Sequence, residues 1–221
     1  MAGQRQRPNR AGRRQRSQSG RKQSPPVEVF LNLPYDEKFQ RLYLAYICGV
    51  RALGIAPRVT LEIPGGTRRL DRILDLIQKC PFSVHDLSRV ELDRGHPSTP
   101  RFNMPFELGL AVAWERTRKA KHTWFVMESM NHRLAKSLRD LNGTDPYIHN
   151  GTIRGVFREL GNAFVRRGKQ PSAQEMWRVY QEIRKGIPAI LRQRGARSVF
   201  EAGVFRDISV GASAAAARIV R

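Results

Sequence analysis

The chain has 221 residues, 40% of them hydrophobic and 27% charged, which is the composition of a globular protein with one sizeable core. No apolar run approaches the roughly 20 residues that cross a bilayer, and the basic N-terminus lacks the apolar stretch of a secretory signal. We therefore expect a cytoplasmic protein without a membrane span. Its two cysteines, Cys48 and Cys80, lie far apart in apolar segments, and its histidines lack metal-ligand spacing, so neither a disulfide nor a metal site is predicted.

The charge is strongly positive, because 40 lysines and arginines accompany only 19 acidic residues, for a net charge of +21. Residues 1–22 contain eight of the basic side chains and no acidic one, namely Arg5, Arg7, Arg10, Arg13, Arg14, Arg16, Arg21 and Lys22. The rest keeps 32 basic against 19 acidic residues, a net charge of +13. Such an excess of positive charge favours the binding of polyanions. For the body of the chain, a genome that favours arginine is an alternative explanation. We expect residues 1–26 to form a disordered basic arm that binds nucleic acid or a ribonucleoprotein.

The first predicted elements follow this arm. Val27 opens an apolar, β-branched run that is typical of a strand. Asp36 can cap the following helix and Gly54 can end it, because a short polar side chain suits one helix terminus and glycine the other. A second strand and a helix capped by Thr67 come next. By residue number, these four elements cover about 27–33, 37–53, 58–62 and 68–77.

The second half continues the alternation of strands and helices. A strand, a long polar loop and a helix that starts near Met104 or Pro105 are followed by a fourth strand. A short helix, a brief strand and two longer amphipathic helices complete the pattern. By residue number, these elements cover about 82–87, 104–118, 122–127, 134–138, 146–149, 153–164 and 173–193. From Gly195 onward the sequence is weakly patterned, and we expect a frayed tail.

This order predicts an α/β protein with a mostly parallel sheet of about five strands, covered by helices on both faces as a three-layer sandwich. We expect the arm over 1–26, the α/β domain over 27–168, and a C-terminal helix with its tail over 169–221. In such sheets ligands bind at the carboxyl ends of the strands, near the point where the strand order reverses. Candidate site residues are therefore the polar residues that directly follow each strand.

Several common site types are absent from those strand ends. No glycine-rich phosphate loop ending in Gly-Lys is present, and no Gly-x-Gly-x-x-Gly follows the first strand. These absences argue against an ATPase and against a dinucleotide oxidoreductase of the usual type. Ser88 and His85 lack the strand–turn–helix context of a nucleophilic serine, so a serine hydrolase is poorly supported.

Glu107 is the strongest candidate for a reactive group. We predict it in the first turn of an otherwise apolar helix, where the helix dipole favours an ionised carboxylate, while Phe102, Met104 and Phe106 would desolvate it. A carboxylate so placed can attack or stabilise the oxocarbenium-like carbon of a breaking glycosidic bond. The alternative is an ordinary helix-start glutamate, since acidic residues are common at that position.

Two segments together resemble the nucleoside 2-deoxyribosyltransferase-like superfamily. The segment Val29-Phe30-Leu31-Asn32-Leu33-Pro34-Tyr35 is similar to its first strand and loop, and Phe106-Glu107-Leu108-Gly109-Leu110-Ala111 is similar to the helix start that carries its catalytic glutamate. TIR-type NAD hydrolases place a Glu-Leu pair at the same helix. Segments 82–111 and 140–151 also resemble small bacterial TIR-like proteins of phage defence, and the likeness covers about residues 27–165.

The resemblance implies a flavodoxin-like fold and cleavage of an N-glycosidic bond in a nucleoside, a nucleotide or NAD, as in a bacterial defence or toxin-type effector. Glu107 would be the nucleophile or oxocarbenium stabiliser, with Asp86 as a second acid at the facing strand end. The substrate-binding residues would be Asn32, Pro34, Tyr35, Ser88 and Asn103. Asp86 has an alternative role as a turn former.

The nature of the activity stays open at this point. Hydrolase and transferase outcomes both fit the Glu107 motif, and a non-catalytic nucleotide-sensing or assembly module would have much the same sequence. A nucleic-acid-binding protein that acts through residues 1–22 is a third reading. We expect no metal and no cofactor, with NAD as a candidate substrate, and we expect a homo-oligomer.

Overall fold

The computed structural model describes residues 25–63, 66, 68–89, 96–99, 102–118, 121–141, 143–165 and 170–220. Residues 1–24 of the arm predicted over 1–26, which include its seven arginines and Lys22, lie outside the described residues, and so does Thr67, the predicted cap of the second helix. Within the described part, no helix is both long enough and apolar enough to cross a membrane.

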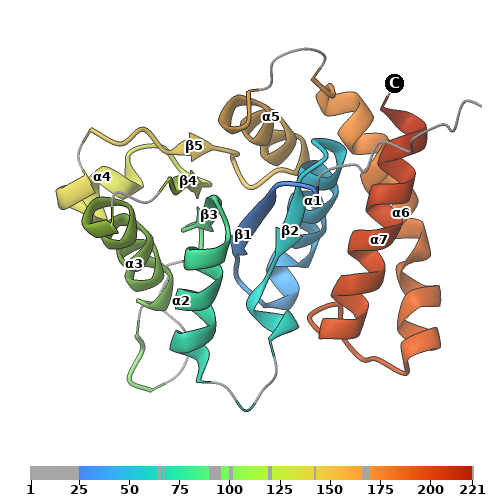
Figure 1. The fold of residues 1–221 in the computed structure, drawn as a ribbon, viewed down its shortest axis with the longest axis horizontal. Coiled ribbons are helices and arrows are strands. Elements are labelled where there is room, and N and C mark those ends of the chain that lie inside the picture. Colours follow the sequence, from blue (N-terminus) through green and yellow to red (C-terminus); the bar gives the residue numbers. More distant parts are fainter. Residues whose placement is uncertain are drawn as a thin grey trace, which may run out of the picture.

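A five-stranded, all-parallel sheet forms the centre of the molecule, with the strand order β2-β1-β3-β4-β5 (Figure 1). The strands are β1 Glu28–Asn32, β2 Ala56–Arg58, β3 Phe82–Asp86, β4 Thr123–Glu128 and β5 Tyr147–Ile148. This order is that of flavodoxin, and it reverses direction between β1 and β3. The predicted α/β class and the parallel sheet are confirmed.

Helices cover both faces of this sheet. They are α1 Gln40–Ala52, α2 Arg69–Lys79, α3 Asn103–Arg118, α4 Arg133–Ser137, α5 Ile153–Ala163, α6 Ala173–Arg194 and α7 Ala202–Ile219. Figure 1 shows α2 and α3 on one side of the sheet and α1 and α5 on the other, with α6 and α7 outside α1. Short 3-10 helices occupy Glu37–Phe39, Thr60–Glu62 and Arg139–Leu141.

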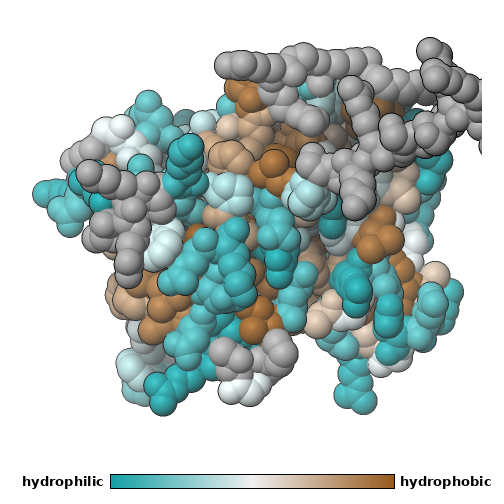
Figure 2. All heavy atoms as spheres, viewed as in Figure 1, coloured by the Kyte–Doolittle hydropathy of each residue, from teal (hydrophilic) through white to brown (hydrophobic). Residues whose placement is uncertain are grey.

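The side chains of β1 show how the strands divide the core. Val29 and Leu31 belong to the large apolar cluster shared with α1, α5, α6 and α7, whereas Phe30 belongs to the cluster under α2. This alternation follows from the two-residue period of a strand. Seen from the side of Figure 2, hydrophilic side chains cover much of α2, with apolar patches beside them.

The predicted second strand, over 58–62, is wrong in position. The strand β2 covers Ala56–Arg58, and residues 60–62 form a 3-10 helix instead. The Glu62 carboxylate accepts a hydrogen bond from the Val59 amide at 3.0 Å, which supports this turn. Pro57 lies within β2, and it is tolerated because β2 is the edge strand of the sheet.

The expected frayed tail is also wrong. Residues 202–219 form the helix α7, which packs along α6 and α1. Its buried side chains include Val204, Phe205 and Ile208, followed by three small ones, Ala212, Ala215 and Ala216. These alanines bury little apolar surface each, so the segment lacks the strong apolar periodicity by which a helix is recognised in sequence.

Candidate active site at the β1–β3 switch point

A polar cleft lies beside the carboxyl ends of β1 and β3, where the strand order reverses and where ligands bind in folds of this type. Its volume is about 280 Å3. The cleft is lined by Leu33, Pro34 and Tyr35 from the loop after β1, by Arg69 at the start of α2, by Arg89 after β3, and by Asn103 and Met104 of α3. Three of the predicted substrate-binding residues, Pro34, Tyr35 and Asn103, thus lie together.

Glu107 lies next to this cleft without lining it. Its side chain is 4% exposed, and one oxygen, Oε1, lies 3.5 Å from Nη2 of Arg69. The other oxygen, Oε2, is buried and has no hydrogen-bond partner among the described residues. Burial raises the pKa of Glu107 above its ordinary value, while Arg69, Asn32 and Asn103 oppose the rise. A carboxylate whose Oε2 has no hydrogen-bond partner among the described residues is therefore held beside the cleft.

Two details of the predicted setting of Glu107 are wrong. The helix α3 begins at Asn103, so Glu107 lies in the second turn, where the helix dipole acts more weakly than in the first. Phe102 and Phe106 are exposed, so they do not desolvate Glu107. The groups that act electrostatically on it are polar, and they come from the end of β1, from α2 and from α3 itself.

Arg69 and Tyr35 are two of the polar groups that lie between the cleft and Glu107, and Asn103 is another. The guanidinium of Arg69 contacts Glu107 but is 53% exposed, so it can also meet a ligand in the cleft. The Tyr35 hydroxyl lies 3.1 Å from Oγ1 of Thr60, and burial raises the pKa of Tyr35 to about 12. Tyr35 therefore acts as a neutral hydrogen-bonding group at ordinary pH.

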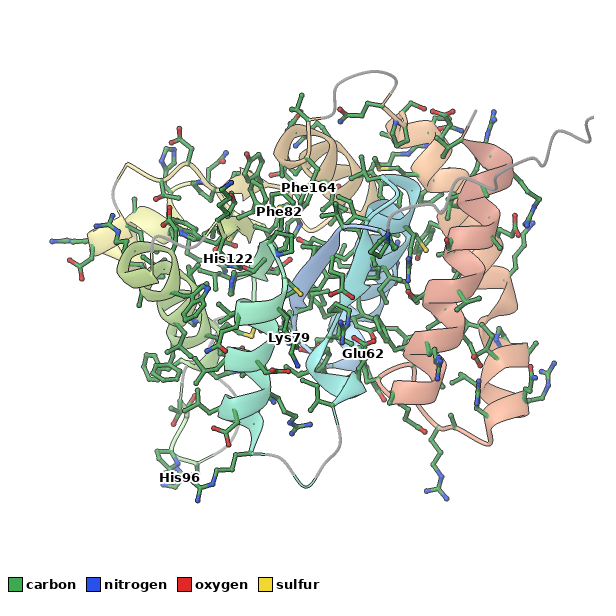
Figure 3. All side chains as sticks on the ribbon, viewed as in Figure 1. Glu62, Lys79, Phe82, His96, His122 and Phe164 are labelled. Carbon is green, nitrogen blue, oxygen red and sulfur yellow. The ribbon has the colours of Figure 1, made fainter. Side chains whose placement is uncertain are left out.

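Asn32, at the end of β1, is held by a row of buried hydrogen bonds. Its Nδ2 donates to Nδ1 of His85 at 3.1 Å, and Nε2 of His85 donates to Oγ of Ser83 at 2.9 Å. The Ser83 hydroxyl in turn donates to Nε2 of His122 at 2.9 Å, and Nδ1 of His122 donates to the carbonyl oxygen of Cys80 at 2.8 Å. Figure 3 places His122 on the side of the sheet covered by α2 and α3. The two ends of the row decide which atom donates in each hydrogen bond, since the amide nitrogen of Asn32 only donates and the carbonyl oxygen of Cys80 only accepts.

Both histidines in this row are neutral at ordinary pH. Burial, helped by the nearby His122, lowers the pKa of His85 to about 3, and burial also lowers the pKa of His122. Neutral rings are what the row requires, because each ring accepts on one nitrogen and donates from the other. The amide of Asn32 is thereby held in one orientation beside Glu107.

Asp86 does not face Glu107, which differs from the predicted arrangement. It alternates with His85 on β3 and points to the sheet face under α1 and α5. There its carboxylate accepts from the Tyr46 hydroxyl at 2.7 Å and lies 3.2 Å from Nε2 of His149. Burial opposes the charge of Asp86, yet His149, Ser88 and Tyr46 together hold its pKa below the ordinary value.

Ser88 belongs to the same buried cluster as Asp86 and not to the lining of the cleft. Its backbone amide donates to Oδ1 of Asp86 at 2.8 Å, and its hydroxyl donates to the same oxygen. This is the turn-forming role that was the alternative for Asp86. The cluster closes the end of β3 against α1 and the loop after β5, so these two residues support the fold beneath the site.

Sequence reasoning missed Arg69, Arg89 and His85 as site residues. Arg69 begins α2, which follows β2, so it lies at the same carboxyl edge of the sheet as Glu107. The signal that could have found it is its position at the first residue of a helix that leaves this edge. No group of three or more His, Cys, Asp or Glu side chains within the described ranges could hold a metal ion.

Comparisons with known proteins leave the family open, since no protein-family model, no curated protein and no solved structure matches this chain. The likeness to deoxyribosyltransferase-like and TIR-like proteins thus rests on the segments around Asn32 and Glu107, and the site has to be interpreted from its own geometry.

Proposed function

We propose that this protein cleaves the N-glycosidic bond of a nucleotide-type substrate with the Glu107 carboxylate. The observation that carries the proposal is the buried Oε2 of Glu107, which has no hydrogen-bond partner among the described residues and lies beside a polar cleft at the strand-order switch point. A buried polar atom without a partner is rare and is stabilised when a ligand supplies one. In the course of the reaction, the electron-deficient anomeric carbon of the substrate would become the partner of Oε2.

The chemistry needs one bond to form as another breaks. Oε2 of Glu107 would bond to the anomeric carbon while the carbon–nitrogen bond breaks, and the base would leave with the bonding electron pair. A departing purine or pyrimidine would take a proton from water, whereas the cationic nicotinamide of NAD would leave as a neutral base without one. Water would then cleave the resulting ester, which gives hydrolysis, or a second base would attack it, which gives transfer. Asn32, held by His85, would orient the carboxylate, and Tyr35 would contact the sugar or base.

The two arginines of the cleft support a phosphorylated substrate. Arg69 and Arg89 line one small cleft, where Arg69 is 53% exposed and Arg89 pairs with Asp36 at 3.4 Å. Guanidinium groups suit phosphate oxygens because they donate two parallel hydrogen bonds. We therefore favour a nucleotide or NAD over an unphosphorylated nucleoside. This preference also fits the role that Glu107 would have in a bacterial defence or toxin-type effector.

The test is incubation of the protein with NAD, deoxynucleoside monophosphates and nucleosides, with free base measured by chromatography. We expect Glu107→Gln to lower base release by on the order of 1000-fold, because it removes the group that bonds to the substrate. Glu115→Gln is the matched control, since it makes the same isosteric change on the same helix, and it should keep the activity. Equal turnover in Glu107→Gln and the unsubstituted protein would rule the proposal out.

A second candidate, a nucleotide-binding module without catalysis, is favoured by one observation. Glu107 is nearly closed from solvent and already pairs with Arg69, as a structural carboxylate would. In that case NAD or a nucleotide would bind with an affinity that falls in Arg69→Gln, and no free base would form.

A further inference from the structure

A second cavity lies on the other face of the sheet, among the first residues of α1 and α5 and the side of α6. Its volume is about 550 Å3. Three cationic side chains line it, Lys38, Arg41 and Arg154, and no acidic side chain is among its described lining residues. The cavity takes no part in the cleft described above.

The cations of this cavity come from separate elements, which the fold brings together. Lys38 and Arg41 belong to the turns that open α1, and Arg154 is the second residue of α5. In the described part of the chain, no salt bridge joins any of the three to an acidic residue. Three cations that line one cavity, without an ion-pair partner among the described residues, attract an anion more strongly than the same charges spread over a surface.

The start of α5 strengthens this attraction. Residues Gly151 to Arg154 line the cavity, and the Thr152 hydroxyl accepts only the Gly155 amide at 3.0 Å. The first amides of a helix have no partner within the helix, and its positive end favours negative charge. The backbone and the three side chains therefore act in the same direction, toward an anion with several oxygens.

The aromatic side chain of the cavity is arranged to hold an arginine. The guanidinium carbon of Arg154 lies 5.1 Å from the centre of the Trp177 ring, and Tyr180 stacks against that ring at 5.5 Å. Because Trp177 already has these two neighbours, it offers little surface to a stacking base. Recognition here would act on phosphate groups and would be independent of base sequence.

We propose that this cavity binds the phosphate groups of a nucleic acid strand. A free mononucleotide fits less well, since Trp177, the aromatic residue among the described lining residues, already has a neighbour on its ring and offers little surface to a base. The net charge of +21 for the whole chain favours a long polyanion over a single phosphate. The cavity would then fix the strand to the folded body, independently of the basic segment 1–22 and of the activity of Glu107.

The test measures binding of the full chain to single-stranded DNA of about 16 nucleotides across a series of salt concentrations. Replacing Lys38, Arg41 and Arg154 together by glutamine removes three phosphate contacts. We expect the slope of log affinity against log salt to become shallower by about 2. The matched control replaces Arg116, Lys136 and Arg139 by glutamine, which removes the same charge from exposed positions on α3, α4 and the following turn, and it should change the slope far less.

Two results would overturn the proposal. Equal changes in the two triple variants would show that only overall charge matters, and an unchanged slope in the cavity variant would show that the strand does not use the cavity. Adenosine monophosphate serves as a separate probe, and tight binding that depends on the same three residues would assign the cavity to a mononucleotide instead. Thermal unfolding of each variant checks that the fold is kept.

Discussion

The burial of the Glu107 carboxylate lowers the stability of the folded protein at neutral pH. Burial raises its pKa, which means that the folded protein binds a proton at this carboxyl group more readily than the unfolded chain does. As the pH rises above the ordinary value of 4.5, the unfolded state loses its proton first, and the folded state becomes relatively less stable. Unfavourable burial of this kind is common where a residue serves function.

The upward shift of the Glu107 pKa gives a prediction for the Glu107→Gln variant. At pH 7 to 8 we expect it to melt at a higher temperature than the unsubstituted protein, because the carboxamide carries no charge to desolvate. Below about pH 4.5 the advantage should disappear, since the carboxyl group is then neutral in both states. Thermal melts at several pH values measure it. The difference in melting temperature between the variant and the unsubstituted protein should be more favourable to the variant at pH 8 than at pH 4. The opposite order would contradict the prediction.

Some site residues could be predicted from sequence and others could not. Asn32 ends a strand, Tyr35 follows it and Glu107 lies near the start of a helix, so their edge of the sheet could be inferred. Asp86 also follows a strand, but its face depends on the alternation along β3, and one residue decides whether a side chain points to α3 or to α1. The position of Arg69 at a helix start could be inferred, but its contact with Glu107 depends on the packing of α2 beside α3, which no local pattern contains.

At the scale of elements, the loop between β5 and α5 depends on one glycine. A β-carbon added to Gly155 would lie 2.0 Å from the carbonyl oxygen of His149, a backbone atom that cannot rotate away. The same loop places His149 against Asp86. The absence of a side chain at Gly155 thus lets α5 start close enough for the cluster beneath the site to form.

We therefore expect Gly155→Ala to lower the free energy of unfolding by about 1–3 kcal/mol, as overpacking does elsewhere. Gly186→Ala is the control, because Gly186 lies within α6 and a β-carbon there meets no heavy atom within 4 Å. That substitution should stabilise the protein by up to about 1 kcal/mol through helix propensity. Urea denaturation measures both, and similar effects at the two glycines would refute the role given to Gly155.

Most elements could be predicted because their apolar periodicity is strong, and the exceptions have physical reasons. The edge strand β2 is three residues long and contains Pro57, so its pattern is weaker than that of the neighbouring turn. The helix α7 buries alanines against α1, and small side chains give little contrast between the two faces of a helix. In both cases tertiary packing supplies what the local sequence lacks.

At the scale of the whole molecule, α6 and α7 extend the core of the sheet. Their buried side chains belong to the same apolar cluster as β1 and α1. A boundary near residue 169 therefore does not separate two cores, and the C-terminal helices should unfold together with the sheet.

Phe205→Ala tests this coupling. Phe205 is 1% exposed, so we expect a loss of about 3–5 kcal/mol of stability within a single cooperative transition. Val210→Ala in the same helix is the control, since Val210 is 62% exposed and its loss should change stability by less than about 0.5 kcal/mol. Circular dichroism and tryptophan fluorescence should give coincident unfolding curves. Two separate transitions would show that the C-terminal helices fold independently.

The hydrogen-bonded row from Asn32 to Cys80 limits where protons can travel. It starts at an amide nitrogen that cannot accept and ends at a carbonyl oxygen that cannot donate, so its sense cannot be reversed. With the pKa of His85 near 3, the row does not take up a proton at ordinary pH either. The row therefore does not carry protons through the interior of the sheet, and we expect a proton exchanged at Glu107 to come from the side of the cleft.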